Sequence, residues 1–325
     1  MALYLISCVG VEHDLPYLEH FVRHYRSLGV EPDSFYILMH AKDPASPRLG
    51  EAKAILARHD ITGIPWIEPN YSSVGMWQQR QNLQKRIAKP EDWVISADID
   101  ELHEYPAPLE DIIAWCEREG HEIVQGPFID RLSADGQLVD VPGPDRRLED
   151  VFPVQAELRH HIGGYTTNVN LAGSVNLMLV RGDVLLGNGG HSPEIGHQNR
   201  RYALGGILWR FDRLAEPKFL FSIPFLVHHY KWTTGLLEHS VKRLEGEAMT
   251  PADREYTEKL VAFFRSAEGI PVDALATRDP ARDQPADWQA KVRELRRSYA
   301  FMRPMIDAKR AFRKVVRIGR KAIGK

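Results

Sequence analysis

The first 130 residues alternate between short apolar runs and amphipathic stretches of helical period. Apolar runs rich in β-branched and aromatic side chains are typical of buried strands, and apolar residues spaced three and four apart are typical of helices. The runs predict strands over 3–9, 35–39, 64–67, 93–97 and 122–128. The stretches between them predict helices over 15–28, 49–58, 75–88 and 109–119. Alternation of this kind predicts an α/β fold whose central, mostly parallel sheet is flanked by helices.

The pattern changes after residue 130. Gly, Pro, Asp and Arg are frequent over 131–175, which predicts long loops at the edge of the sheet. Short strands are predicted over 175–180 and 184–186. The apolar run over 219–229 is interrupted by Pro224, so we expect an edge or bulged strand there.

The last part of the chain is predicted to be helical, at about 235–246, 251–267 and 285–300. The simplest division is one domain over 1–240 and a helical C-terminal extension over 241–325. The extension ends in a tail, 309–325, that carries eight basic residues (Lys309, Arg310, Arg313, Lys314, Arg317, Arg320, Lys321, Lys325) and no acidic residue. Its apolar residues recur at helical spacing, which predicts a basic amphipathic helix that binds a membrane surface. The alternative is a solubilising tail without ordered structure.

The composition is that of a globular protein, with 43% hydrophobic and 26% charged residues in a chain of 325. The net charge of −2 argues against a nucleic-acid-binding protein. No apolar run is long enough for a membrane-spanning helix, and the first residues do not resemble a secretory signal. Two cysteines, Cys8 and Cys116, do not make a disulfide framework. We therefore expect a cytoplasmic protein, which the tail would attach to the inner membrane surface as a peripheral protein.

Three carboxylates, Asp98, Asp100 and Glu101, follow the predicted strand over 93–97. Ligands of open α/β sheets bind beyond the carboxyl ends of the strands. Like charges this close repel one another unless positive charge lies between them. Mn²⁺ or Mg²⁺ would supply that charge and would in turn hold a diphosphate. The alternative is a solvated acidic turn in which an Asp caps a helix.

The strand followed by Asp98-Ile99-Asp100-Glu101 resembles the D-x-D motif of glycosyltransferases of the GT-A fold. Two more segments are similar to the glycosyltransferase family 2 and family 92 group: residues 20–30 with 35–37, and the late VHHYKW segment over 227–232. Together these blocks lie within 1–240, and they depart from the usual pattern where Leu102-His103 follow Glu101. The resemblance implies a GT-A (Rossmann-like) sheet and a nucleotide-sugar donor whose diphosphate is held by a metal on the motif.

The resemblance also implies a metal shell made by Asp98, Asp100 and a late histidine, either His229 or His228. A neutral imidazole suits Mn²⁺ as well as a carboxylate does. Adjacent side chains of a strand point to opposite faces, so we expect only one of the two histidines to bind, and we prefer His229. The alternative is that both are buried, hydrogen-bonded histidines of the sheet.

The same resemblance implies that two elements bind the donor: the loop after the first strand and the helix before the D-x-D strand. We expect the backbone of Cys8 and Val9 at the base, Glu12 or Asp14 at the ribose, and Lys231 at a diphosphate oxygen beside Asp98. The helix carries four polar or aromatic residues on one face: Trp77, Arg80, Gln81 and Gln84. That face suits a nucleotide, with Arg80 and Gln81 as the contacts; the alternative is a solvent-facing side.

An inverting transferase needs a base that deprotonates the acceptor hydroxyl. The candidates are Asp130, which follows a predicted strand, and His191 and Glu194 in the glycine-rich loop over 187–194, with Asp212 as a further one. The alternative for the loop is an ordinary Gly/Asn turn. Five basic residues of the middle loops would bind phosphate or line the surface: Arg146, Arg147, Arg159, His160 and His161.

These features predict a metal-dependent glycosyltransferase of the hexosyltransferase type. It would move a sugar from a UDP- or GDP-sugar to a hydroxyl of a glycan or lipid-linked acceptor, in the synthesis of cell-envelope or surface polysaccharide. Two alternatives are a sugar-phosphate nucleotidyltransferase and a metal-dependent hydrolase. The first would need a phosphate loop with Gly and Arg after the first strand, which residues 9–13 do not provide. The second would more often show closely spaced histidine pairs, which we do not find in the sequence. A third alternative is a binding protein without catalytic activity, which would keep its biological activity when Asp100 is replaced with Ala.

Overall fold

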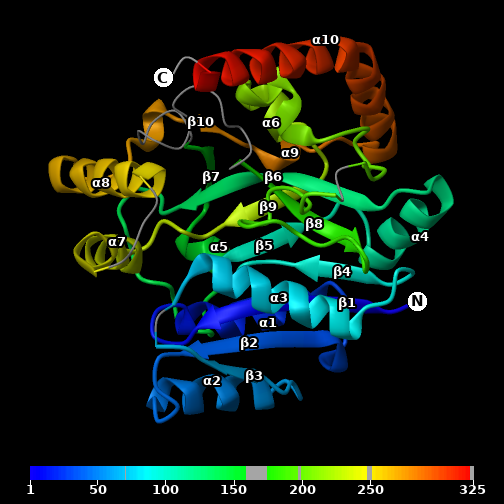
Figure 1. The fold of residues 1–325 in the computed structure, drawn as a ribbon. Helices are drawn as coiled ribbons and strands as arrows, with labels where there is room; N and C mark the ends of the chain where they lie inside the picture. Colours follow the sequence, from blue (N-terminus) through cyan, green and yellow to red (C-terminus); the bar gives the residue numbers. More distant parts are fainter. Residues whose placement is uncertain (70, 159–173, 197–198, 247–250, 323–325) are drawn as a thin grey trace.

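The computed structural model describes residues 1–69, 71–158, 174–196, 199–246 and 251–322 (Figure 1). The strands are β1 (Leu3–Gly10), β2 (Phe35–Ala41), β3 (Ile64–Ile67), β4 (Trp93–Ser96), β5 (Glu101–Glu104), β6 (Ile123–Leu132), β7 (Val154–Glu157), β8 (Val175–Arg181), β9 (Leu226–His229) and β10 (Ala276–Thr277). The helices are α1 (Leu15–Ser27), α2 (Pro47–Ala57), α3 (Ser73–Ile87), α4 (Leu109–Glu119), α5 (Leu148–Val151), α6 (Pro217–Phe221), α7 (Thr234–Gly246), α8 (Pro251–Ser266), α9 (Pro280–Asp283) and α10 (Trp288–Ala322).

The centre of the sheet has the strand order β3-β2-β1-β4-β8-β6. The first four strands are parallel, and β8 pairs antiparallel with both β4 and β6. Only β8 therefore runs against the others, so the predicted α/β fold with a mostly parallel central sheet is confirmed. Beyond β8, β6 also pairs with β7 and β9, and β9 pairs with β5. This arrangement is consistent with the GT-A fold that the sequence resembles.

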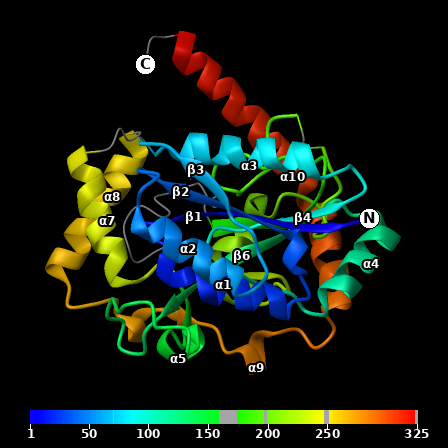
Figure 2. The same ribbon diagram turned by 90° about the horizontal axis from the view of Figure 1, so that it is seen from below.

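Helices cover both faces of the sheet (Figure 2). Leu5 and Ile37 point to one face and pack in the core cluster that also holds residues of α1 and α2. Ile6 and Leu38, one position further along each strand, pack with Trp77 of α3 in a second cluster. This alternation follows from the period of two along a strand, and it explains why β1 and β2 are mostly apolar on both faces.

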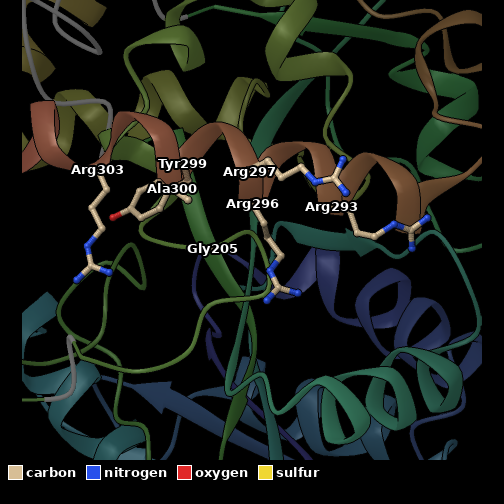
Figure 3. A pocket seen from close by; sticks show the side chains of 7 residues that line it. All are labelled: Gly205, Arg293, Arg296, Arg297, Tyr299, Ala300 and Arg303. Carbon is tan, nitrogen blue, oxygen red and sulfur yellow. The ribbon is translucent and has the colours of Figure 1, made fainter.

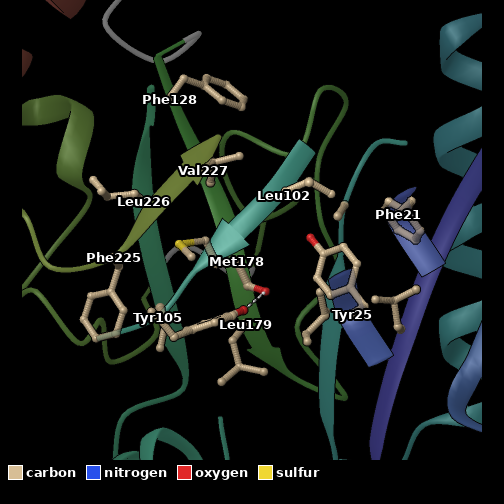
Figure 4. Packing of buried hydrophobic residues seen from close by; sticks show 14 of the residues in the cluster. Phe21, Tyr25, Leu102, Tyr105, Phe128, Met178, Leu179, Phe225, Leu226 and Val227 are labelled. Carbon is tan, nitrogen blue, oxygen red and sulfur yellow. Dashed lines mark hydrogen bonds between the residues drawn. The ribbon is translucent and has the colours of Figure 1, made fainter. Parts of the chain in front are cut away.

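A packed junction fixes the turn between β4 and β5 (Figure 4). Leu102 of β5 and Val227 of β9 lie in one core cluster with Tyr25 of α1. The Tyr25 hydroxyl donates to the carbonyl of Glu101 at 3.1 Å, and the Tyr105 hydroxyl donates to the carbonyl of Met178 at 3.1 Å. The first residue of β5 is therefore held by a hydrogen bond from α1.

The prediction of an edge or bulged strand over 219–229 is wrong for the first half of the segment. It is also wrong about the place of the strand in the sheet. Residues Pro217–Phe221 form the short helix α6, and β9 begins only at Leu226. β9 lies between β5 and β6 and is not an edge strand. Residues 219–221 of α6 and all of β9 are buried, and an apolar run of this length does not distinguish a buried strand from a buried helix. Over 184–186 only an isolated bridge forms, and β5 was not predicted.

The C-terminal helix α10 is longer than the predicted 285–300 and reaches Ala322. Val292, Leu295 and Tyr299 belong to the same core cluster as the parallel strands, so its first turns are built into the main body. The backbone is helical through most of the tail, whose side chains from residue 309 lie outside the described residues. Within the described part of the chain, no helix has the length and apolar character needed to cross a membrane. The boundary at residue 240 stays a prediction.

Gly206 allows α10 to pack, and we expect Gly206→Ala to destabilise the protein by about 1–3 kcal/mol because of overpacking. A Cβ atom there would lie 2.0 Å from the ring of the buried Tyr299. Gly50, inside α2, has nothing within 4 Å of such an atom. Gly50→Ala should therefore stabilise the helix by about 0.5–1 kcal/mol. Urea unfolding of both variants checks this, and equal stability changes would contradict the packing described for α10.

Candidate functional site

A cleft of about 550 Å³ opens beyond the carboxyl ends of β1 and β4. Asp14 follows β1, Asp98 and Asp100 follow β4, and His229 and Lys231 come from the end of β9 and the segment after it. Helices α7 and α8 close the far side. A cleft at the carboxyl edge of parallel strands is where an α/β fold binds its ligands, and its volume lies in the range of small-molecule sites.

Arg80 holds the start of the acidic turn in place. It is only 2% exposed and donates through Nη1 to Asp98 Oδ1 at 2.5 Å. Its Nη2 donates to the carbonyls of Ala97 at 2.5 Å and Ile6 at 3.1 Å. The same guanidinium lies over the ring of Trp77, 4.4 Å from its centroid. Arg80 therefore holds Asp98 in place from the protein interior. Arg80 was predicted to contact the donor, but it does not line the cleft.

Glu101 is the buried member of the acidic cluster. Its Oε2 accepts hydrogen bonds from Asn176 Nδ2 at 2.6 Å and from the backbone N–H of Asp98 at 3.2 Å. Burial, and then the charge of Asp98, raise the pKa of Glu101 to about 8. Glu101 therefore fixes the turn, whereas Asp98 and Asp100 face the cleft with 41% and 26% of their side chains exposed.

His229 lies between two carboxylates. The strand register places it opposite Glu101 of β5 and opposite Asp130 of β6. Its Nε2 is 3.5 Å from Asp100 Oδ2, and its Nδ1 is 3.7 Å from Asp130 Oδ1. Burial opposes the charge on the ring, but the two carboxylates raise the pKa of His229 to about 10. The two carboxylates therefore favour a positively charged ring beside Asp100. A bound metal would compete with this proton, so His229 stays a predicted metal ligand.

His228 points to the opposite face of β9 and does not line the cleft. Its Nε2 is 2.7 Å from Glu104 Oε2, and its Nδ1 is 3.5 Å from Nη1 of Arg131. The predicted alternative ligand is thus a buried, paired histidine of the sheet.

The polar face of α3 is buried and serves the fold. Gln81 Nε2 donates to the carbonyl of Leu186 at 2.6 Å, and Gln84 Nε2 donates to the carbonyls of Gly182 and Val184 at 3.0 and 2.9 Å. These bonds tie α3 to the turn after β8. The prediction of a donor contact at Gln81 is therefore wrong, and so is the alternative of a solvent-facing side.

Five of the expected donor contacts line the cleft: Cys8, Glu12, Asp14, Asp98 and Lys231. Glu12 lies at the rim and accepts a hydrogen bond from Ser46 Oγ at 2.8 Å. Lys231 Nζ donates to the hydroxyl of Tyr256 at 2.8 Å, which fixes the ammonium group at the cleft wall. The side chain of Val9 packs in the core, and the contact expected of its backbone stays a prediction.

Of the four expected bases, Asp130, His191 and Glu194 lie outside the lining of this cleft. Asp130 accepts from Trp232 Nε1 at 2.7 Å and from the N–H of Leu158 at 3.3 Å, so it lies behind His229. His191 Nδ1 lies 2.8 Å from the carbonyl of Val175. The side chain of Asp212 and residues 159–161 lie outside the described residues. No described contact brings Glu194 to the acidic turn.

Several cleft residues were missed by the sequence reasoning. Lys42 directly follows β2, so the strand-end rule that selected Asp98 would have found it. Tyr71, His239 and Arg243 reach the cleft from a loop and from α7, and only the tertiary fold shows them. Cationic side chains therefore share the cleft with the carboxylates.

Asp14 was expected at the ribose and is a half-buried carboxylate that lines the cleft. Its Oδ2 accepts from the N–H of Gly10 at 3.1 Å. Burial, and then the charge of Asp100, raise the pKa of Asp14 from 3.8 to about 7. The folded protein therefore holds this proton over a pH range in which the unfolded chain has lost it.

The free energy of unfolding should consequently fall, through this group, as the pH rises from about 4 to about 7. In Asp14→Asn the side chain stays neutral, so the variant should gain stability relative to the wild type over that range. Urea unfolding in a chelator at about pH 5 and pH 8 measures the difference. Asp111→Asn, on the exposed side of α4, serves as the control. A stability difference for Asp14→Asn that does not change with pH would contradict a raised pKa.

The residues fit a divalent cation that is shared with a substrate. In the described part of the chain, no group of three or more His, Cys, Asp or Glu side chains is arranged to hold an ion by itself. Two carboxylates, Asp98 and Asp100, face the same cleft. Mg²⁺ is usually held by one or two carboxylates together with substrate phosphates and water. The donor set therefore suits an ion that binds with a phosphate ligand.

No protein-family model matches the chain, and no curated protein matches it. Among solved structures, S. aureus TarS 1–349 in complex with UDP-GlcNAc matches with 10% identity and a TM-score of 0.34, over 82% of this chain and 72% of that chain. The mannosyltransferase PcManGT from Pyrobaculum calidifontis, in complex with GDP-Man and Mn²⁺, matches with 13% identity and a TM-score of 0.32, over 84% and 77%. Likeness at these scores carries no argument about function.

Proposed function

We propose that the chain is a glycosyltransferase that takes a sugar from a nucleoside-diphosphate sugar, with a hydroxyl of a glycan or lipid-linked glycan as the acceptor. One observation carries the proposal: Asp98 and Asp100, fixed at the carboxyl end of β4, face a cleft of about 550 Å³ that also contains Lys42 and Lys231. A cleft with both signs of charge suits a ligand that is held through a cation and by direct ion pairs.

The charges in the cleft favour a diphosphate bound through a metal. Asp14, Asp98 and Asp100 would repel a diphosphate directly, because like charges at short distance are costly. A bound Mn²⁺ or Mg²⁺ would neutralise the charge that develops on the leaving diphosphate. Asp98 and Asp100 are the residues that would hold it.

The other residues position these two groups. His229 lies between Asp100 and Asp130, at 3.5 and 3.7 Å, and Asp130 is itself held by a hydrogen bond from Trp232 Nε1. Lys231, held by Tyr256, presents an ammonium group to the cleft for a phosphate oxygen. His191 remains our candidate for the base on the acceptor side, and its ring packs against Phe128, 6.0 Å away between centroids.

A thermal-shift panel tests this proposal. The full chain would be heated with UDP-, GDP-, CMP- and TDP-sugars, each with Mn²⁺ and with a chelator. We expect stabilisation that needs both the metal and one type of nucleotide, because ligands that bind only the folded state raise the melting temperature. A panel without a shift in any condition would contradict the proposal.

The panel is followed by a product assay that separates the two transferase classes. A glycosyltransferase releases a nucleoside diphosphate from the stabilising donor. A sugar-phosphate nucleotidyltransferase would instead release pyrophosphate from a nucleoside triphosphate and a sugar phosphate. Pyrophosphate release without any donor cleavage would replace the proposed function with that alternative.

A further inference from the structure

The glycine-rich loop over 187–194 is bound to the start of β8 by two hydrogen bonds. His191 Nδ1 lies 2.8 Å from the carbonyl of Val175, and the N–H of Leu177 donates to the carbonyl of Gly190 at 3.0 Å. A carbonyl only accepts hydrogen bonds, so His191 carries a proton on Nδ1 and the lone pair of a neutral ring lies on Nε2. The loop therefore presents an imidazole in a fixed tautomer, as a general base requires.

Asn176, which lies between those two residues of β8, is bound to the acidic turn. It is only 2% exposed, and its Nδ2 donates to Glu101 Oε2 at 2.6 Å. The same Glu101 oxygen accepts from the N–H of Asp98 at 3.2 Å. Asn176 Oδ1 accepts from the N–H of Leu177 at 2.8 Å, which fixes the orientation of the amide. One side chain therefore connects β8 to the turn that carries Asp98 and Asp100.

The loop also approaches the side chain of Asn176 closely. A Cβ atom at Gly190 would lie 2.5 Å from Asn176 Oδ1 and 3.1 Å from the ring of Trp77. The φ of Gly190 is 69°, a conformation that glycine adopts without a steric cost. Both the space and the backbone conformation therefore require a glycine where the loop meets Asn176.

The ring of His191 lies close to the charged residues of the site. Its centroid is 6.0 Å from that of Phe128, whose other neighbour is the ring of His229 at 4.8 Å. Burial lowers the pKa of His191, whereas the hydrogen bond with Val175 and the charge of Asp98 raise it. The ring is therefore near enough to Asp98 to respond to its charge, although it does not line the cleft.

We propose that Asn176 is a positioning residue that couples the loop of His191 to the turn of Asp98 and Asp100. The inference rests on the proposed function, in which the diphosphate leaves at the turn while a base takes the proton of the acceptor hydroxyl. The two groups must keep their separation, because a displacement of about 1 Å costs about a hundredfold in rate. Asn176 keeps it by contacting the loop at Gly190 and the turn at Glu101.

Donor cleavage with Mn²⁺ and with water as the acceptor tests this inference, on the UDP- or GDP-sugar that stabilises the protein most. Asn176→Ala should lower the release of nucleoside diphosphate about a hundredfold. Its affinity for that nucleotide should stay within about threefold of the wild type, because Arg80 still holds Asp98. In a His191→Gln background the same substitution should cost less than about threefold in rate, because groups that act as a unit are not additive.

Gly190→Ala disturbs the same contact from the side of the loop and should show the same loss of rate. Gly29→Ala is its control, since Gly29 also has a positive φ but nothing within 4 Å of the added atom. Gln125→Ala is the control for Asn176, because it removes a buried amide that accepts from the N–H of Leu208 at 2.7 Å. That segment continues from Gly205, which lines a surface pocket along α10 (Figure 3). Both controls should keep their rates within about twofold of the wild type.

A measurement without a donor separates this inference from the proposed function. NMR follows the titration of the His191 imidazole, whose signals are identified by their loss in His191→Gln. In Asn176→Ala the ring should be less buried, so its pKa should rise toward the ordinary value of a histidine, whereas Gln125→Ala should leave it unchanged.

Three results would overturn the inference: a wild-type rate in Asn176→Ala, equal losses of rate with and without His191, or an unchanged titration of His191. Equal losses would show that Asn176 only stabilises the fold, and circular dichroism checks that each variant is folded. A wild-type protein that releases no nucleoside diphosphate would contradict the proposed function, and this role with it, before any variant is compared.

Discussion

Asp100→Asn should lower the release of nucleoside diphosphate from the sugar donor by about a thousandfold or more, which corresponds to about 4 kcal/mol of transition-state stabilisation. Asparagine has nearly the same shape but no charge. It would weaken the hold on a cation and would lose the charged contact with His229, whose Nε2 lies 3.5 Å from Asp100. The donor that stabilises the protein most in the thermal-shift panel is the substrate for this assay.

The control for that result is Asp111→Asn, which also removes one negative charge but lies on α4, outside the cleft. Its activity should equal that of the wild type. Circular dichroism and urea unfolding check that Asp100→Asn is folded. An Asp100→Asn protein with at least a tenth of the wild-type rate, roughly 1.4 kcal/mol or less of lost stabilisation, would contradict a role of this carboxylate at the diphosphate.

Arg80→Met should lower the free energy of unfolding by about 2–4 kcal/mol, because it removes three hydrogen bonds that a buried guanidinium donates. Arg80 donates to the carbonyls of Ala97 and Ile6 inside the protein. The ion pair with Asp98 adds less, since that carboxylate is 41% exposed and solvent screens the pair. The donor-dependent thermal shift should also disappear, because Asp98 loses its support.

Urea unfolding of Arg80→Met measures this effect, and Arg86→Met serves as the control. Arg86 lies on the exposed side of the same helix α3. It should cost less than about 0.5 kcal/mol, as is usual for a surface substitution. Equal costs for the two variants would show that the bonds of Arg80 do not hold the turn.

Much of the fold was predictable because its first half consists of simple repeating units. β1 to β4 and the helices between them follow the alternation of apolar runs and helical stretches. The errors lie where burial removes the pattern. In the run over 219–229, Pro224 was interpreted as an interruption within one strand, whereas it lies between the end of α6 and the start of β9. β5 carries Leu102 between charged and polar neighbours, and only its pairing with β9 makes it a strand.

The candidate site was predictable where local chain geometry determines it. Asp98 and Asp100 follow a buried strand, and the strand-end rule placed them at the cleft. The polar side of α3 was misinterpreted because its partners, the carbonyls after β8, lie about a hundred residues away in the sequence. The pairing of His229 with both Asp100 and Asp130 likewise depends on the register of three strands.

Titration calorimetry with UDP and GDP, each with Mn²⁺ and with a chelator, tests most directly whether Asp98 and Asp100 hold a cation together with a diphosphate. We predict that one of the two nucleotides binds at least about tenfold more tightly with the metal, a difference of about 1.4 kcal/mol. Replacing both Asp98 and Asp100 with Asn should abolish the effect of the metal. Equal affinity with Mn²⁺ and with the chelator, or a doubly substituted protein that still responds to Mn²⁺, would contradict the account.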